Sequence, residues 1–354
     1  MKAIGVTRDG DGPELLDVER PEPTEGEALV RTLRVGVDGT DHEVVAGSHG
    51  GYPEGSEYMI LGHEAVGVVE DGNGSGLEAG QVVVPTVRRK PDGETNEYFR
   101  RGEPDMAPDG EYVERGIVGD HGFMSEYFTS PADNLVPIPE ELAEYGMLVE
   151  PISIAEKAND HAFSTREPFE WRPESACVLG NGSLGLLTLW MLGREFERTY
   201  CVGRRSRPDP TIDVMDELGA TYVDSRETPV DELPDAYEAV DYVFEATGYA
   251  PHAVQTVHAL APNGVGALLG IPGPWEFEID GGAFHKDIVL HNKCLIGTVN
   301  SHVTHFEDAV DTLEAMPEWL LEELVTTIAT PETVDAAFED DDDQIKGVVE
   351  FAAL

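Results

Sequence analysis

The stretch ACVLGNGSLGLLTLWMLGREF, residues 176–196, decides the architecture of the second half of this 354-residue chain. The short apolar run ACVL is typical of a buried strand, and LLTLWMLGREF is typical of a helix. Between them, GNGSLG spaces Gly180, Gly182 and Gly185 as G-x-G-x-x-G. Glycines at such a turn let the backbone approach a pyrophosphate at the helix N-terminus. The stretch therefore predicts a dinucleotide site, and a tight structural turn is the alternative interpretation.

The sequence that follows continues to alternate strands with helices. TYCVG is a second strand and TIDVMDELG a second helix, and VDYVFEATG, GVGALLGI and CLIGTVN are later strands. Alternation of this kind predicts a doubly wound parallel sheet with helices on both faces.

The first part of the chain has a different pattern, made of short strands and turns. EALVRTLRVGVDG alternates apolar and polar residues, and AVGVVEDG and GQVVVPTV are further strands. The final helical segment and the strand GVVEFAAL are expected to return to this part. We therefore expect an α/β protein with a β-rich domain at 1–155 and 302–354 and a nucleotide-binding domain at 156–301.

The composition is strongly acidic, with 70 Asp and Glu against 23 Lys and Arg and a net charge of −47. Such a charge repels itself in dilute buffer, but the Debye length falls to about 3 Å in 1 M salt. The acids are dispersed and Lys is scarce, which favours a salt-adapted, halophilic cytoplasmic protein over one that binds a basic partner. The sequence lacks the basic stripe that is typical of nucleic-acid-binding proteins. Its longest apolar stretch, residues 184–193, is too short to span a membrane.

Three candidate metal ligands lie in the β-rich part. Asp38 in GVDGTDHEVV, His63 in ILGHEAVGVV and Glu150 in MLVEPISIAEKA each follow a strand-like or apolar segment. A catalytic zinc takes about three protein ligands and keeps one open position. In so acidic a chain, a surface carboxylate and a structural histidine are the competing interpretation.

The end of the second strand of the nucleotide domain distinguishes NAD from NADP. The sequence there is VGRRSRPD, which places Arg204, Arg205 and Arg207 where an acid would bind the 2′-hydroxyl of NAD. Guanidinium groups suit the 2′-phosphate of NADP. The alternative is an exposed loop whose arginines pair with nearby acids.

Taken together, the motifs resemble the zinc-dependent medium-chain dehydrogenase/reductase family, and within it the microbial glucose dehydrogenases of haloarchaeal type. GxDGTDHE, GHEAVGVV, YVERGIVGDHGFMSEY, VEPISIAEKA, LGNGSLG and GTVNS match in order, nearly from end to end. The resemblance implies a GroES-like catalytic domain and a Rossmann domain. It implies oxidation of an aldose, with D-glucose as the first candidate, at C1 to the lactone by zinc-assisted hydride transfer to NADP. A zinc-dependent alcohol or polyol dehydrogenase is the alternative enzyme, and a metal-free NADP-binding redox sensor is the alternative outside that class.

The resemblance also assigns roles to residues. It gives the zinc to Asp38, His63 and Glu150, with Glu64 as an alternating ligand or a neighbour of the ligands. It implies that Thr40 touches the reacting hydroxyl or the nicotinamide ribose, with His42 or a Glu as proton relay. Sugar hydroxyls are expected at Glu114 and Asn300, with Glu150 and Thr40 helping. NADP is the preferred cofactor and NAD the alternative, with contacts expected at Gly180, Asn181, Gly182, Ser183, Leu184, Gly185, Arg204, Arg205, Arg207, Thr247, Leu269, Val299 and Asn300.

Two departures from the family are visible. Asp38 stands where the family usually has Cys, and a carboxylate is a harder donor than a thiolate. The segment 88–110, where many relatives bind a structural zinc through cysteines, contains no Cys. We therefore expect one zinc per subunit and no structural zinc, in a homo-oligomer for which a dimer is favoured over a tetramer.

Overall fold

The computed structural model describes residues 1–354 except 11, 92–94 and 340. It divides into two compact units, one made of Met1–Ile154 and Asn300–Leu354 and the other of Ala155–Val299. The boundaries predicted from the sequence, at 155 and 302, lie one and two residues away. The predicted α/β fold class, with one β-rich and one parallel-sheet domain, is confirmed.

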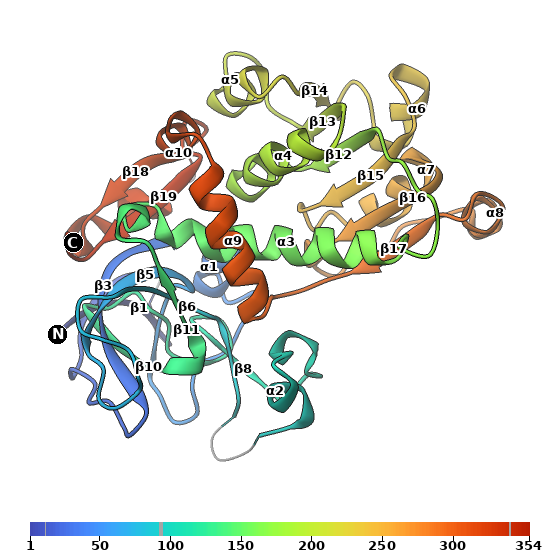
Figure 1. The fold of residues 1–354 in the computed structure, drawn as a ribbon. Helices are drawn as coiled ribbons and strands as arrows, with labels where there is room; N and C mark the ends of the chain where they lie inside the picture. Colours follow the sequence, from blue (N-terminus) through green and yellow to red (C-terminus); the bar gives the residue numbers. More distant parts are fainter. Residues whose placement is uncertain (11, 92–94, 340) are drawn as a thin grey trace. The chain divides into compact units, whose positions relative to one another are not determined.

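Unit 1 is organised around a seven-stranded sheet (Figure 1). Its central strand is the sequence EALVRTLRVGV, which is rich in β-branched residues and is buried along most of its length. This strand ends directly before Asp38 and so positions the first candidate ligand. The strands run in the order β11 (Leu135–Ile138), β6 (Val82–Pro85), β5 (Glu64–Asp71), β3 (Glu27–Val37), β19 (Lys346–Glu350) and β18 (Val325–Ala329), with β10 (Tyr127–Pro131) paired to β3.

Two small sheets and several short helices complete unit 1. The sheets are β2 (Glu14–Asp17), β1 (Lys2–Thr7) and β4 (Tyr58–Ile60), and β7 (Arg88–Arg89), β8 (Val113–Arg115) and β9 (Gly119–Asp120). The helices are α1 (Gly39–Val45), α2 (Glu97–Arg101), α9 (Val303–Ala315) and α10 (Glu318–Leu324), with the 3₁₀ helices η1 (Pro104–Met106), η2 (Ala132–Asn134), η3 (Glu140–Leu142), η4 (Gly146–Leu148) and η6 (Pro331–Phe338). Helix α3 (Val149–Ser164) begins in unit 1 and ends in unit 2.

Unit 2 is built on a six-stranded sheet in which every neighbouring pair of strands is parallel. The first strand in sequence lies inside the sheet, which is the order of doubly wound dinucleotide-binding domains. The predicted Rossmann domain is therefore confirmed. The strands run in the order β14 (Thr221–Asp224), β13 (Arg198–Gly203), β12 (Ser175–Leu179), β15 (Val240–Glu245), β16 (Leu260–Leu268) and β17 (Cys294–Gly297).

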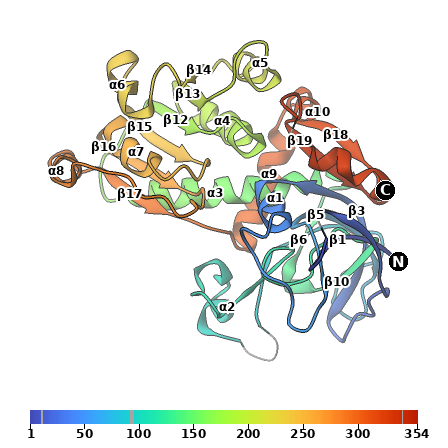
Figure 2. The same cartoon turned by 180° about the vertical axis from the view of Figure 1, so that it is seen from behind.

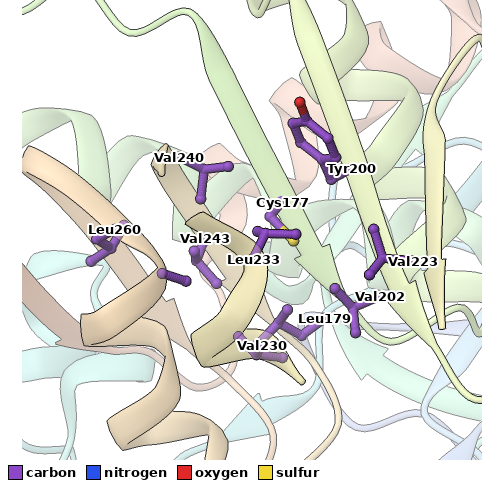
Figure 3. Packing of buried hydrophobic residues seen from close by; sticks show 11 residues of the cluster. Cys177, Leu179, Tyr200, Val202, Val223, Val230, Leu233, Val240, Val243 and Leu260 are labelled. Carbon is purple, nitrogen blue, oxygen red and sulfur yellow. The ribbon is translucent and has the colours of Figure 1, made fainter. Parts of the chain in front are cut away.

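Helices cover both faces of this sheet, with α4 on one side and α7 on the other (Figures 1 and 2). Successive strand residues point to opposite faces, so Tyr242 packs against Phe163 of α3 at 5.6 Å between ring centroids, while its neighbour Val243 faces the other layer. In that layer, Val230 and Leu233 gather with the sheet side chains in one buried cluster (Figure 3). The helices of unit 2 are α4 (Ser183–Glu195), η5 (Val230–Glu232), α5 (Pro210–Glu217), α6 (Leu233–Ala236), α7 (His252–Ala259) and α8 (Gly281–His291).

Candidate active site

Unit 1 brings together the four residues that were proposed as metal ligands. Asp38 caps the N-terminus of α1, and His63 immediately precedes β5, which begins with Glu64. Glu150 lies in the first turn of α3. Their donor atoms form two groups that share His63, one with Asp38 and one with Glu64 and Glu150, and within each group the atoms lie within 4.8 Å of one another.

The spacing and chemistry of these donors fit a zinc ion. His63 Nε2 lies 3.6 Å from Asp38 Oδ2, and two ligand atoms at zinc-bond lengths in a tetrahedral site are about 3.3–3.6 Å apart. Imidazole nitrogen and carboxylate oxygen are both ordinary zinc donors. His63, Glu64 and Glu150 are buried, while Asp38 is half-buried, which leaves access from one side.

The electrostatics of the cluster also favour a bound cation. The pKa of Glu150 is raised to about 8, first by burial and also by the carboxylates of Glu64 and Asp38, against the opposing charge of His63. Burial likewise raises the pKa of Glu64. For Asp38 the effect of burial is outweighed by the charge and hydrogen bond of His63 together with the charge of Lys346 and the Asp41 amide, and its pKa is lowered. The positive charge near Asp38, Glu64 and Glu150 is too small for all three carboxylates to be ionised together. A bound divalent cation would supply the missing positive charge.

Asp41 was not among the predicted site residues, but the structure places it in one group with Asp38 and His63. It is fully buried, and its carboxylate accepts hydrogen bonds from the backbone amides of Gly62, at 3.1 Å, and Asp38, at 3.2 Å. Its Oδ1 lies 3.8 Å from His63 Nδ1, the ring nitrogen that faces away from Asp38. At this distance the two groups interact by charge and are not hydrogen-bonded. A negative charge behind a ligating imidazole favours the orientation in which the other ring nitrogen faces the metal. Only its burial distinguishes Asp41 from the other acids of this acidic segment.

Lys346, in β19, was also missed. It is 1% exposed and forms an ion pair with Glu64, which is 2% exposed. Strand β3 passes this pair at Gly36, where a Cβ atom would lie 2.1 Å from Glu64 Oε2 and 2.9 Å from Lys346 Cε. Gly36 thus makes room for the ion pair of Glu64 and Lys346, two residues 282 positions apart in sequence. Glu64 lies between this lysine and the other candidate metal ligands.

The two residues proposed to bind sugar hydroxyls contact each other. Asn300 Nδ2 donates to Glu114 Oε1 at 3.1 Å, and both side chains are buried. Arg88 Nε donates to the same Glu114 oxygen at 2.9 Å. Glu114 is therefore a held, buried acceptor rather than a surface acid. Arg88 was not among the predicted site residues.

The two other proposed participants of unit 1 lie on α1. Thr40 is half-buried in its first turn, next to Asp41. His42 lies outside the buried cluster, because its ring is exposed and packs edge-on against Phe338 at 5.4 Å between centroids. A direct role in the cluster is thus open to Thr40, whereas His42 faces solvent.

In unit 2, the glycine loop joins β12 to α4 as the sequence predicts. Gly180 has a φ of +114°, which side chains rarely adopt. A Cβ on Gly185 would lie 2.0 Å from the Gly180 carbonyl oxygen, so only glycine lets the helix approach the strand. Gly182 is the N-cap of α4 and has open space where a Cβ would be. This is the geometry that brings a phosphate group to the first amides of a helix, here those of Ser183 and Leu184.

The arginines follow the end of β13, but their surroundings differ. Arg204 is exposed, and Arg205 is half-buried with Nη1 3.7 Å from Asp209. Arg207 is held by Asp216 through two hydrogen bonds, of 2.6 and 2.8 Å. The alternative interpretation, in which these arginines pair with nearby acids, therefore describes Arg207 better than Arg204 or Arg205.

The remaining proposed cofactor contacts lie after the carboxyl ends of the other parallel strands. Asn181, in the turn between β12 and α4, donates from Nδ2 to Thr211 Oγ1 of α5 at 2.7 Å. Thr247 follows β15, where its amide donates to Glu245 at 2.8 Å. Leu269 follows β16, and Val299, which is exposed, follows β17. Ligands of open parallel sheets bind outside this edge.

Comparisons with known proteins agree with this architecture. The family described as Alcohol dehydrogenase GroES-like domain matches residues 24–140, and that described as Glucose dehydrogenase C-terminus matches residues 143–351. The chain belongs to the zinc-dependent medium-chain dehydrogenases, in the glucose dehydrogenase family.

Individual relatives are similar over their whole length. A glucose 1-dehydrogenase of Haloarcula marismortui is 78% identical, covering 100% of both chains. The solved structure of Haloferax mediterranei glucose dehydrogenase in complex with NADP, Zn and gluconolactone is 62% identical and has a TM-score of 0.99, again over 100% of both chains. A structure of the D38C mutant of that enzyme has a TM-score of 0.98 at the same coverage. Within the part of the chain that the structure describes, no helix combines the length and apolarity needed to cross a membrane.

Proposed function

We propose that the chain oxidises D-glucose at C1 to the lactone, with zinc as the catalytic metal and NADP as hydride acceptor. The observation that carries the proposal is the Haloferax mediterranei complex with NADP, Zn and gluconolactone, which has a TM-score of 0.99 to this chain. The Haloarcula marismortui relative, at 78% identity, is likewise a glucose 1-dehydrogenase. The donor cluster of unit 1 and the glycine loop of unit 2 supply the two binding functions that this reaction requires.

The metal would be held by Asp38, His63 and Glu150, with Glu64 as an alternating ligand that Lys346 holds when it is not bound. When bound, zinc lowers the pKa of the sugar's C1 hydroxyl as a Lewis acid, and NADP accepts the hydride. Asp41 orients His63 so that Nε2 faces the metal position.

The sugar would be held by Glu114 and Asn300, whose mutual hydrogen bond uses Oε1 of Glu114, so that its Oε2 and the second lone pair of the Asn300 amide oxygen would serve hydroxyl groups. Asn300 Oδ1 already accepts from the Ser301 amide at 2.8 Å, which fixes the orientation of the side chain. Thr40 is half-buried beside the cluster and is suited to contact the reacting hydroxyl. His42 faces solvent and is suited only to the outer end of a proton relay.

A panel of substrates tests the function. Aldoses, polyols and simple alcohols are assayed with NADP and with NAD in multimolar salt, and the product is identified as lactone or its hydrolysis product. We expect glucose with NADP to give the highest kcat/KM. A higher value for a polyol or an alcohol would assign the chain to the alternative enzyme class, and absence of turnover with all of them would contradict the proposal.

The role of Glu114 is tested by Glu114→Gln, which keeps the size of the side chain but removes its charge. We expect the KM for glucose to rise about tenfold or more, because hydrogen bonds to a charged group contribute roughly 1.5–3 kcal/mol, while NADP affinity measured by fluorescence titration stays unchanged. Glu111→Gln, at an exposed acid three positions away, is the matched control. Normal glucose kinetics in Glu114→Gln would remove this residue from the sugar site.

We further propose that the protein is a homodimer that pairs through unit 2. Strand β17 forms one edge of the sheet of unit 2. Helix α8 and the segment before it expose large apolar side chains, namely Ile271, Trp275, Phe277, Ile279, Val289 and Leu290. Exposed apolar surface of this extent next to an open strand edge favours association with a second copy around a two-fold axis. Acidic residues are dispersed over the rest of the chain, so this apolar face is better suited to a dimer interface than other faces.

Light scattering in high salt tests the dimer. Leu290→Asp is expected to lower the mass to that of one chain, whereas Leu15→Asp, at an exposed leucine of unit 1, is expected to leave the mass unchanged. A wild-type mass of a single chain, or an unchanged oligomer in Leu290→Asp, would contradict this assignment.

A further inference from the structure

A separate group of side chains that could hold a metal ion lies in unit 1 and shares no residue with the cluster of Asp38 and His63. It consists of Asp105 in η1, His302 at the N-cap of α9 and His305 in the first turn of α9. Each of the three offers one donor atom, and these atoms lie within 4.8 Å of one another. His302 Nδ1 is 3.1 Å from Asp105 Oδ1, and the two imidazole rings are 4.0 Å apart between centroids.

The surroundings of these side chains suit a bound ion. Asp105 is 5% exposed and His305 is 6% exposed, while His302 is half-buried and gives access from solvent. Two histidines three positions apart at the start of one helix project from the same side. Imidazole and carboxylate together form a donor set suited to zinc and neighbouring divalent transition metals.

A simple ion pair is the competing explanation, and it accounts for only part of the geometry. One protonated imidazole beside one carboxylate explains the contact of His302 with Asp105. The second ring is also held by a long contact from the His302 amide to His305 Nδ1, at 3.5 Å, at the start of α9. Neither contact requires donor atoms of all three side chains to gather within 4.8 Å of one another. A metal ion accounts for all three donors at once and leaves one position for water.

The cluster also connects two segments that carry the proposed sugar contacts. Asp105 lies in the segment 88–110, and its carbonyl oxygen accepts from Arg88 Nη1 at 2.8 Å. Arg88 in turn holds Glu114, and Glu114 holds Asn300, two positions before His302. The contact of His302 Nδ1 with Asp105 Oδ1 closes this chain of contacts into a ring, and an ion bound there would strengthen the link between η1 and the start of α9.

We propose that Asp105, His302 and His305 bind a second divalent transition-metal ion, zinc by its donor preference, which fastens η1 to the start of α9. This proposal differs from the expectation of one zinc per subunit. That expectation rested on the absence of Cys from 88–110 and did not consider ligands from distant parts of the chain.

Metal counting tests the proposal. The protein is stripped with a chelator in high salt, equilibrated with Zn²⁺, freed of unbound metal by gel filtration, and analysed for zinc per chain. We expect two equivalents in the wild type, and one each in the double variant His302→Asn with His305→Gln and in Asp38→Ala. His258→Asn is the matched control, because it removes an imidazole 3.3 Å from another carboxylate, that of Asp287, and should keep two.

A second measurement distinguishes loss of metal from misfolding of a variant. Circular dichroism and thermal unfolding in high salt establish whether each variant folds. The single variant His302→Asn changes only the half-buried ligand and keeps a favoured N-cap residue, so it decides the matter if the double variant does not fold. We expect the affinity of the second equivalent to fall at least tenfold in this variant.

The outcomes distinguish the second metal from the catalytic one. Loss of one equivalent in the His302 and His305 variants supports the proposal, whatever the Asp38 variant does. One equivalent in the wild type at saturating Zn²⁺, or an equal number in the wild type and the double variant, would overturn it. The count needs no sugar turnover, so it stands or fails separately from the proposed glucose oxidation.

Discussion

The candidate metal centre of unit 1 and the nucleotide loop of unit 2 are built in opposite ways. The metal centre is made of side chains from five separate places in the sequence, namely Asp38, Asp41, the pair His63 and Glu64, Glu150 and Lys346. The nucleotide loop is made of backbone, within the six residues from Gly180 to Gly185. Changes in unit 1 should therefore act through charge and coordination, and changes in the loop of unit 2 through space and backbone conformation.

The largest effect is expected at Asp38. Asp38→Ala removes a charged donor, and we expect loss of bound zinc and a fall in activity of about a thousandfold, because Lewis-acid assistance contributes several kcal/mol and each 1.36 kcal/mol is tenfold in rate. Asp38→Cys should keep zinc and activity, since thiolate is a good zinc donor. Elemental analysis and steady-state rates measure both. Full zinc and full activity in Asp38→Ala would show that the carboxylate is not a ligand.

The next effect is expected at the arginines after β13, where unit 2 does use side chains. The double variant Arg204→Ala with Arg205→Ala should weaken NADP binding about a hundredfold and leave NAD binding nearly unchanged, because charge-assisted hydrogen bonds contribute roughly 1.5–3 kcal/mol each and less in high salt. Arg207→Ala is the matched control, since Asp216 already holds that guanidinium. Cofactor titrations measure the dissociation constants of NADP and of NAD for the double variant and for Arg207→Ala. Equal losses for NADP and NAD would show that these arginines do not contact the 2′-phosphate.

A smaller effect should follow from Asp41→Asn, which keeps the shape of the side chain but removes the charge behind His63. We expect zinc affinity to fall about 10–100-fold, the usual consequence of losing an acceptor behind a metal ligand. Competition with a zinc chelator measures the constant. Glu43→Gln, at an exposed acid of the same helix, should have no effect. If the two variants bind zinc equally well, the role of Asp41 is limited to its hydrogen bonds with backbone amides, and it does not support His63 as a metal ligand.

The smallest effect, and the sharpest test of the backbone side of the comparison, concerns the glycines of α4. Gly185→Ala forces a Cβ to 2.0 Å from the Gly180 carbonyl oxygen, and we expect a loss of about 1–3 kcal/mol in stability together with weaker NADP binding. Gly193→Ala meets open space in the same helix, and should be stabilising by up to about 1 kcal/mol. Chemical denaturation in high salt measures both. Similar changes in the two variants would show that the contact of Gly185 with Gly180 is not tight.

Sequence and structure contribute differently to the two sites. The strand, the glycine turn and the helix of residues 176–196 follow from consecutive residues, because turn geometry and helix start are local properties. The types of the candidate ligands Asp38, His63 and Glu150 were also readable, since each ends an apolar segment and has the right donor chemistry. Composition indicated salt adaptation without any structural information.

Only the tertiary structure separated the important acids from the rest. Asp41 and Asp105 are indistinguishable in sequence from the other acidic residues, and burial alone sets them apart. Lys346 meets Glu64 because β19 pairs with β3 beside β5, and His302 meets Asp105 across 197 positions. Contacts of this range depend on strand pairing and packing of the whole unit. A local pattern does not contain them, because side chains far apart in sequence become neighbours only when the core has formed.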